Sequence, residues 1–381
     1  MDRSDILLVG LGGAGGNLVD TIVNKNPMFE CLFINTSITD IQSLTNSNEE
    51  VENFYCISKV NGVGRDRTKG KAFAKQRGLN ILDTISRYNQ KKIYLVTSFG
   101  GGSGSSILSV LTEGIDKFIA NGEEFDKDIN LIAILPSLDS STEILQNTKD
   151  TWNEVMSKKC ITSIIPISNN CITDCSNINN SEEDINNNFA DIFDSIFDIP
   201  IDNGMKFDAG NLGNILNDKG FLYFYDLGDY GNIEEAMNNK DNNSCLAPIY
   251  TDKNFNMEIQ ADNSIAIKCG YVGVSFDSED YNKSYIYKNF KNDKDKETYV
   301  GENVYEHNIL ILSGMLPPLD IMTMLEHELK DRNKISNNIS NMDFSKFTIG
   351  DNNSVENNTV NENSKVPTKK KKRKLPKHLF I

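Results

Sequence analysis

Two glycine-rich segments are the places in this chain where the backbone could approach a phosphate. The first spans residues 10–17 (GLGGAGGN), directly after a short apolar run at 6–9 and at the start of a helical pattern. Glycine lets the main chain come close to a ligand, and a helix N-terminus offers unpaired N–H groups with a partial positive charge. Taken alone, this segment also matches the dinucleotide fingerprint and suggests NAD.

The second segment spans residues 97–106 (TSFGGGSGSS) and again joins an apolar run to a helical pattern. A second glycine turn has no place in an NAD-dependent dehydrogenase. The ribose-binding carboxylate expected after the second apolar run is also missing, since Asn35 and Thr36 stand there. Two helix N-termini that face one polyphosphate explain both segments. The alternative is a flexible Gly/Ser turn, which the three consecutive glycines before an amphipathic helix disfavour.

The first half of the chain alternates short buried strands with helices, which predicts an α/β fold with a doubly wound parallel sheet. Strands are expected at 6–9, 31–34, 92–96, 130–135 and 161–167, and helices at 17–23, 68–88, 103–119 and 152–158.

Residues 182–199 carry an apolar stripe at helical spacing that ends before Pro200, which predicts a central linking helix. The following pattern predicts a smaller mixed α/β domain, with strands at 221–225, 264–275 and 308–313 and helices at 233–237 and 319–330. From 332 onward Asn, Ser and acidic residues dominate, as in a disordered linker. The expected parts are therefore 1–184, the helix 185–200, 201–331, and the linker and basic tail 332–381.

Charge is spread unevenly along the chain. The net charge is -15, yet the last thirteen residues hold seven cations and no acid: Lys369, Lys370, Lys371, Lys372, Arg373, Lys374 and Lys377. The body should repel nucleic acid, while the tail should bind an anionic partner. The seven scattered cysteines are typical of reduced thiols, and no stretch approaches a membrane span, so we expect a cytoplasmic protein without a zinc site.

Together these motifs resemble the tubulin/FtsZ superfamily. Residues 100–105 match its G-G-G-[ST]-G-[ST]-G motif except at the last position, where Ser106 replaces Gly, and residues 10–17 match its first loop. Segment 62–69 takes the place of its third loop, which senses the γ-phosphate. The resemblance implies GTP/GDP as the ligand, with Mg²⁺ between the β- and γ-phosphates. It assigns these residues to nucleotide binding: Gly12, Gly13, Ala14, Gly15, Asn17, Asn35, Gly64, Gly100, Gly101, Gly102, Ser103, Gly104, Ser105, Pro136, Asn169 and Asn187, the last with Asn186 and Asn188 as alternatives.

In this superfamily, hydrolysis is divided between subunits of a head-to-tail homo-polymer. One subunit binds GTP, and the next supplies acidic residues that orient the attacking water. Here Asp208 occupies the first acidic position and Asn211 stands where the second acid would be, with Asp202 as a substitute. An Asn can position water but is not a base. The alternative is that Asp208 only caps a helix that includes Leu212.

The basic tail resembles that of the TubZ branch of the superfamily, which segregates plasmid and phage DNA. The resemblance implies that the tail engages a DNA-bound adaptor of the TubR type. A solvated charge run is the structural alternative. The functional alternatives are an FtsZ-like division protein, a phage-spindle filament and, of another class, an NAD-dependent oxidoreductase.

Overall fold

The structure is a computed structural model that describes residues 1–58, 61–169, 182–198, 207–226, 267–276, 290–292, 295–302 and 309–340. The predicted helix at 233–237, Asp202, and the basic tail lie outside the described residues.

The prediction of a doubly wound parallel sheet is confirmed. Six strands of the first half pair in parallel in the order β3-β2-β1-β4-β5-β6. Their bounds are β1 (Ile6–Leu11), β2 (Glu30–Asn35), β3 (Phe54–Cys56), β4 (Lys92–Ser98), β5 (Asp128–Leu135) and β6 (Ile161–Ser168). Most of their residues are apolar and fully buried, because a parallel sheet is covered on both faces.

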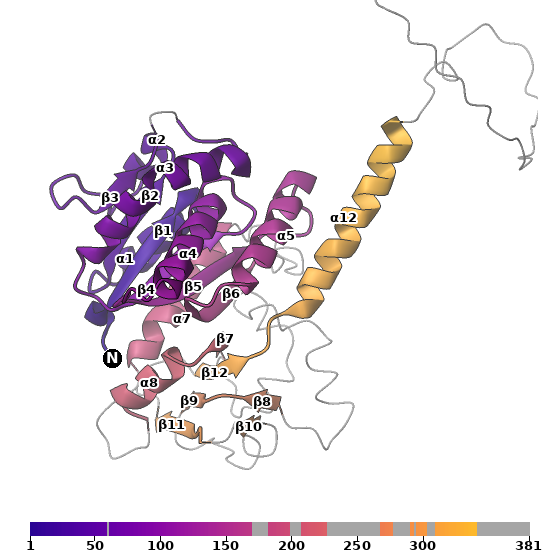
Figure 1. The fold of residues 1–381 in the computed structure, drawn as a ribbon. Helices are drawn as coiled ribbons and strands as arrows, with labels where there is room; N and C mark the ends of the chain where they lie inside the picture. Colours follow the sequence, from indigo (N-terminus) through magenta and orange to yellow (C-terminus); the bar gives the residue numbers. More distant parts are fainter. Residues whose placement is uncertain are drawn as a thin grey trace, which may run out of the picture. The chain divides into compact units, whose positions relative to one another are not determined.

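Helices cover the two faces of this sheet (Figure 1). On one face α1 (Gly12–Lys25) packs with α7 (Glu182–Ser195), which continues as the 3-10 turn η2 (Ile196–Asp198). The other face holds α3 (Arg67–Ser86), α4 (Ser103–Ala120) and α5 (Thr142–Met156). Two shorter elements, η1 (Arg3–Asp5) and α2 (Ile38–Gln42), precede β1 and follow β2.

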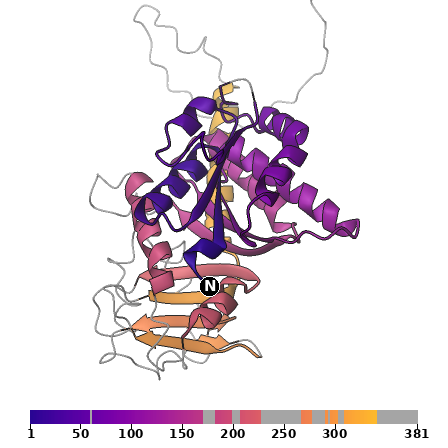
Figure 2. The same cartoon turned by 90° about the vertical axis from the view of Figure 1, so that its left-hand side faces the viewer.

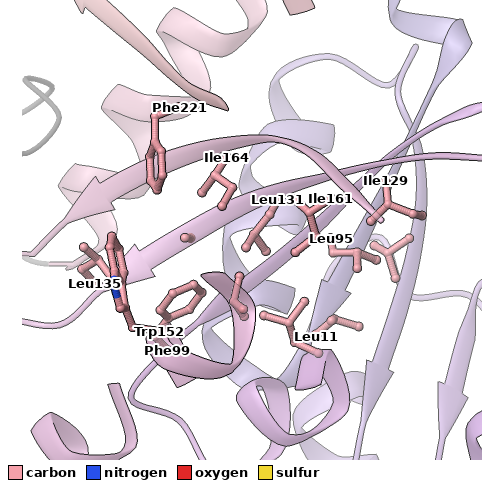
Figure 3. Close-up of a cluster of buried hydrophobic side chains, with 14 of the residues drawn as sticks. Leu11, Leu95, Phe99, Ile129, Leu131, Leu135, Trp152, Ile161, Ile164 and Phe221 are labelled. Carbon is pink, nitrogen blue, oxygen red and sulfur yellow. The ribbon is translucent and has the colours of Figure 1, made fainter. Parts of the chain in front are cut away.

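The core on the α4–α5 face is a layer of aliphatic side chains closed by aromatic rings (Figure 3). The Trp152 ring of α5 lies 6.4 Å from Phe99 and 6.0 Å from Phe221 between ring centroids. Phe99 directly precedes the second glycine segment. This packing therefore fixes the position of the turn after β4 relative to the sheet.

Strands of the second half extend the same sheet beyond β6, in the order β7-β12-β9-β11 (Figure 2). β12 is antiparallel to both β7 and β9, so this part is mixed, as predicted. A separate pair is formed by β10 and β8. The bounds are β7 (Gly220–Asp226), β8 (Ile267–Cys269), β9 (Val272–Phe276), β10 (Phe290–Asn292), β11 (Thr298–Glu302), β12 (Ile309–Met315), α8 (Ala209–Leu216) and α12 (Leu319–Ser340).

Several bounds differ from the sequence expectation. α5 begins at Thr142, well before the predicted 152, because Ser141 caps a first turn whose polar residues hide the helical period. α12 continues to Ser340, past the predicted start of the linker at 332. None of the helices in the described residues is long and apolar enough to span a membrane.

Candidate functional site

Both glycine segments lie at the carboxyl edge of the sheet, after the neighbouring strands β1 and β4. The chain leaves β1 through α1 on one face and leaves β4 through α4 on the other. Such a reversal is the topological switch point at which open α/β sheets bind their ligands. The order of the strands therefore brings together two turns that are far apart in the sequence.

The two turns touch each other. A β-carbon at Gly12 would lie 2.7 Å from Gly104 N, and one at Gly104 would lie well under 3.0 Å from Thr97 Oγ1 and Leu11 O. Thr97 Oγ1 donates to Leu11 O at 3.1 Å. The close approach requires glycine at both positions, and it merges the two helix N-termini into one surface.

The N-termini of α1 and α4 have no capping side chain. Their N-cap residues are Leu11 and Gly102, and neither makes a side-chain hydrogen bond to the first turn. Four other helices of the described chain are capped by a Ser or Asp side chain: α2 by Ser37, α3 by Asp66, α5 by Ser141 and α8 by Asp208. The first-turn N–H groups of α1 and α4 are therefore available to an anion.

Two glycines of the turns have room around the missing β-carbon. At Gly13 the nearest atom to a β-carbon would be Asp40 Oδ2 at 4.0 Å, and at Gly101 it would be Ser98 O at 3.7 Å. Packing within the chain does not require glycine at these two positions. The missing β-carbons therefore leave open space beside the first-turn N–H groups. Of the predicted residues in the two turns, the exposed or partly exposed ones are Gly13, Ala14, Asn17, Gly101 and Ser103, and the buried ones are Gly12, Gly15, Gly100, Gly102, Gly104 and Ser105.

Oxygen atoms line the same edge beside the first turn. Thr36 Oγ1 lies 2.6 Å from Ser103 Oγ, and Asn35 Nδ2 donates to Asp40 Oδ2 at 3.3 Å. Asn35 Oδ1 accepts from Thr36 N at 2.7 Å, which fixes the amide. Thr36 directly follows Asn35 at the end of β2, whereas no sequence motif points to Asp40. No cluster of three or more His, Cys, Asp or Glu occurs in the described chain, so a cation here would rely on hydroxyls, one carboxylate, water and the ligand's own phosphates.

The Ser105 side chain faces inward rather than toward a ligand. Its hydroxyl donates to Gly101 O and accepts from Arg67 Nε at 3.0 Å, so the predicted contact is left to its backbone N–H. Arg67 Nη2 also donates to Glu154 Oε2 at 2.7 Å. Burial alone would raise the pKa of Glu154, but hydrogen bonds from Lys71, Ser109 and Arg67 outweigh it and lower that pKa to about 2.

Residues 62–69, predicted as the third loop, contact the second glycine turn. Gly62 and Gly64 have φ values of 85° and 58°, and Gly64 is exposed. Asn147 Nδ2, on α5, donates to both Arg65 O at 3.0 Å and Gly100 O at 3.2 Å. This amide ties the loop to the turn after β4. No sequence motif points to Asn147, which lies inside α5 far from the glycine segments.

The remaining predicted contacts follow β5 and β6 along the same edge. Pro136 is buried directly after β5. Asn169 directly follows β6, and its side chain donates to Glu182 Oε1, at the start of α7, at 3.5 Å. Asn187 is partly buried on α7. The described residues thus gather at one edge of the sheet, while their contact with a base stays a prediction.

Asp208 and Asn211 are not part of this edge. They form a reciprocal capping box at the start of α8: Asn211 N donates to Asp208 Oδ1, and Asp208 N donates to Asn211 Oδ1, each at 2.8 Å. The cap that we considered as an alternative role is therefore present. Asp208 is exposed, however, and the described hydrogen bonds of its side chain use Oδ1 alone.

The position of α8 is set by the amino ends of the strands. Lys92, the first residue of β4, donates to Leu216 O at 2.9 Å and to Asn217 Oδ1. The Met1 ammonium donates to Ala209 O at 3.2 Å. Because β4 has seven residues, its two ends lie about 20 Å apart. A side chain on α8 cannot reach the glycine turns of its own chain.

Comparison with known proteins finds a family model that matches part of the chain. Residues 5–177 match the model described as Tubulin/FtsZ family, GTPase domain. The tubulin-like protein TubZ of Clostridium botulinum C phage is 23% identical over 360 residues, which cover 92% of this chain and 90% of that protein.

Solved structures agree on the fold. The tail-truncated TubZ of Clostridium botulinum phage c-st has a TM-score of 0.70 at 21% identity and covers 87% of this chain and 99% of that one. A GTPγS-form protofilament of TubZ from Bacillus thuringiensis serovar israelensis has a TM-score of 0.65 at 14% identity, with 89% and 94% covered. Identities this low establish the shared fold alone.

Proposed function

We propose that this chain is a GTPase of the tubulin/FtsZ family, whose GTPase domain model residues 5–177 match. In this proposal the whole chain polymerises head to tail with GTP and hydrolyses it between neighbouring subunits. In this proposal Asp208 and Asn211 of one subunit complete the nucleotide site of the next. The relative from Bacillus thuringiensis was solved as a GTPγS-form protofilament, which supports such an assembly.

One observation carries the proposal: the two halves of the catalytic apparatus lie at opposite edges of one sheet. The uncapped N-termini of α1 and α4 lie at the carboxyl edge, and Asp208 lies beside the amino edge. About 20 Å separates the two edges. A site that needs both halves therefore requires two subunits stacked in the same direction.

The residues present fit a guanosine triphosphate with Mg²⁺. The first-turn N–H groups of α1 and α4 bind the phosphates, with the open space at Gly13 and Gly101 around them. Mg²⁺ supplies charge neutralisation between the β- and γ-phosphates when it is bound, and Asp40 and the hydroxyls of Thr36 and Ser103 provide oxygen partners beside it. The exposed carboxylate oxygen of the neighbour's Asp208 orients the attacking water.

We extend the proposal to the cargo. In the cytoplasm, the basic tail with Lys369–Lys372, Arg373, Lys374 and Lys377 would bind a DNA-bound adaptor of the TubR type. Filament turnover would then move a plasmid or phage genome. Likeness to the TubZ of Clostridium botulinum C phage supports this cargo over a division site.

Complementation tests the shared site. Gly101→Asp adds a carboxylate at the phosphate position with room in the fold, and Asp208→Ala removes the water-orienting carboxylate. Each variant alone should lose most GTP turnover, while an equal mixture should regain part of it. Recovery is expected because a Gly101→Asp subunit donates its intact Asp208 to the GTP of an Asp208→Ala subunit. A mixture as inactive as its components would refute catalysis between subunits, and absence of GTP binding by the unmodified chain would refute the nucleotide assignment.

A tail deletion tests the cargo. Removing residues 369–381 should leave GTP-dependent sedimentation unchanged, because the tail lies outside the catalytic apparatus. The same deletion should abolish co-sedimentation with the adaptor–DNA complex. If the truncated and the unmodified chain co-sediment equally with the adaptor–DNA complex, the tail is only a solvated charge run.

A further inference from the structure

Lys92 is a buried lysine at the amino end of β4, far from the glycine turns. It is 4% exposed, and its ammonium donates to two neutral oxygens, Leu216 O at 2.9 Å and Asn217 Oδ1. The Asp128 carboxylate on β5 attracts the ammonium, but burial outweighs this attraction and lowers the pKa of Lys92 to about 8. Burying a charge costs stability, so an apolar side chain would serve better if this position only filled the core. The lysine therefore indicates a role beyond packing.

Both acceptors lie at the carboxyl end of α8, the helix that Asp208 caps at its other end. Leu216 is the last residue of α8, and Asn217 is its C-cap. The last carbonyls of a helix have no partner within the helix, and the helix dipole also favours a cation beside them. Lys92 satisfies one of these carbonyls from a different element. It therefore joins β4 to the helix whose first turn holds Asp208.

Other contacts of α8 are made with the second half of the sheet. A β-carbon at Gly273, on β9, would lie 2.7 Å from Ile215 Cδ1, so the helix and this strand are in direct contact. Asn214 Nδ2 donates to the Tyr299 hydroxyl, on β11, at 3.4 Å. These contacts join α8 to the second half, whereas Lys92 joins it to the first.

An open cavity separates α8 from the amino ends of β4 and β5. Its volume is about 590 Å³, and Gly210 and Gly213 line it on the side of the helix. A β-carbon at Gly213 would have no neighbour within 4 Å, so close packing does not set the distance between the helix and the strands here. Polar ties bridge the two sides instead: the buried Lys92 at one end of α8, and the Met1 ammonium, which donates to Ala209 O, at the other.

We propose that Lys92 is a positioning residue for GTP hydrolysis: it holds α8 at the distance from β4 at which Asp208 reaches the nucleotide of the next subunit. The inference rests on the proposed hydrolysis between subunits. Lys92 itself touches no nucleotide, because the glycine turn of β4 lies about 20 Å away at the other end of the strand. One strand thus fixes the spacing of the two half-sites, and a misplacement of about 1 Å in such a geometry can cost on the order of a hundredfold in rate.

The first test separates turnover from binding in the full chain. Lys92→Met keeps an unbranched apolar stem and removes the donors, so phosphate release per filament subunit at saturating GTP should fall about tenfold or more. Equilibrium affinity for a fluorescent GTP should stay unchanged, because the glycine turns are remote. Lys91→Met is the matched control: it removes the preceding lysine, whose side chain is 75% exposed and pairs with the exposed Asp126. It should change neither quantity.

Complementation gives a readout that a loss of stability would not reproduce. Mixed equally with Gly101→Asp, Lys92→Met should regain turnover, because the Gly101→Asp subunit presents an intact α8 to the GTP of the Lys92→Met subunit. Mixed with Asp208→Ala it should stay at the mean of the two components, since both lack a working α8. The reverse pattern, with recovery beside Asp208→Ala alone, would place the defect in the nucleotide site of the Lys92→Met subunit itself and overturn the proposal.

Asn217→Ala tests the same tie from its other side. Asn217 is exposed, so its replacement leaves the core intact and removes one of the two acceptors of Lys92. Turnover should fall severalfold with GTP affinity unchanged, and this variant alone decides if Lys92→Met does not fold. If the unmodified chain hydrolyses GTP and the folded variants keep its turnover, the role of Lys92 is refuted and the GTPase stands. If the unmodified chain hydrolyses no GTP, the proposed function itself fails.

Discussion

Alanine at Gly101 and at Gly104 should separate a ligand-facing glycine from a packing glycine in the same turn. At Gly104 a β-carbon would lie well under 3.0 Å from Thr97 Oγ1 and Leu11 O, so β1 and α4 must move apart. Overpacking of this kind costs about 1–3 kcal/mol, and losing the Thr97–Leu11 hydrogen bond adds about 1 kcal/mol. We therefore expect Gly104→Ala to lower the free energy of unfolding by about 2–4 kcal/mol.

At Gly101 the nearest atom is Ser98 O at 3.7 Å, an ordinary contact. Gly101→Ala should leave stability within about 0.5 kcal/mol of the unmodified chain, yet weaken GTP binding about tenfold because the methyl group takes the space of a phosphate. Denaturant unfolding of the nucleotide-free chain and equilibrium binding of a fluorescent GTP measure the two effects. Normal GTP affinity in Gly101→Ala would show that the phosphates lie elsewhere. An unfolding free energy unchanged in Gly104→Ala would refute the packing argument.

Three further predictions concern charged and polar groups. Asn211→Asp keeps an acceptor for the Asp208 N–H and adds a second acid. GTP turnover per filament subunit, measured by phosphate release, should therefore rise. A fall in turnover would show that the amide itself is needed. The lowered pKa of Glu154, about 2, contributes stability that is fully present above its unfolded pKa near 4.5 and is lost as the pH falls toward 2. Because a third of that side chain is exposed, Glu154→Gln should lower the free energy of unfolding by about 1–2 kcal/mol at pH 7 and by much less at pH 3, as measured by denaturant unfolding. An equal loss at both pH values would contradict a stabilising role of the ion pairs. Burial lowers the pKa of Lys92 to about 8, so between pH 8 and 10.5 the folded chain binds fewer protons than the unfolded chain. The free energy of unfolding should therefore increase as the pH rises through this range. Lys92→Met should reduce this pH dependence, and an unchanged pH dependence would assign it to other groups.

The sequence predicted the catalytic core well because its signals are local. A glycine turn between a strand and a helix is visible in ten residues, and the alternation of apolar runs gives a parallel sheet. The order of the strands is not local, and only the structure brings Gly12 against Gly104. Asn147 and Asp40 were missed for the same reason, since each is an ordinary polar residue until tertiary packing places it beside a turn.

Capping residues also distinguish the two helices that follow the glycine turns. Ser or Asp precedes α2, α3, α5 and α8, whereas Leu11 and Gly102 precede α1 and α4. A helix without a cap leaves N–H groups unpaired, which costs stability unless a ligand satisfies them. Reading the missing caps together with the glycine turns would have pointed to the same two helices without any family resemblance.

If the two proposed half-sites act together, their opposite placement also determines the kind of assembly in which they can meet. In a two-fold symmetric dimer the same patch of each subunit meets its copy, so one patch would have to contain both the glycine turns and Asp208. The sheet separates them by about 20 Å, from the carboxyl edge of β4 to the α8 helix held by Lys92. A head-to-tail contact satisfies one site and leaves a free glycine edge at one end and a free Asp208 at the other. Each added subunit recreates the same two ends, so the arrangement that would complete the proposed GTPase site is also the one that would grow an open, polar filament.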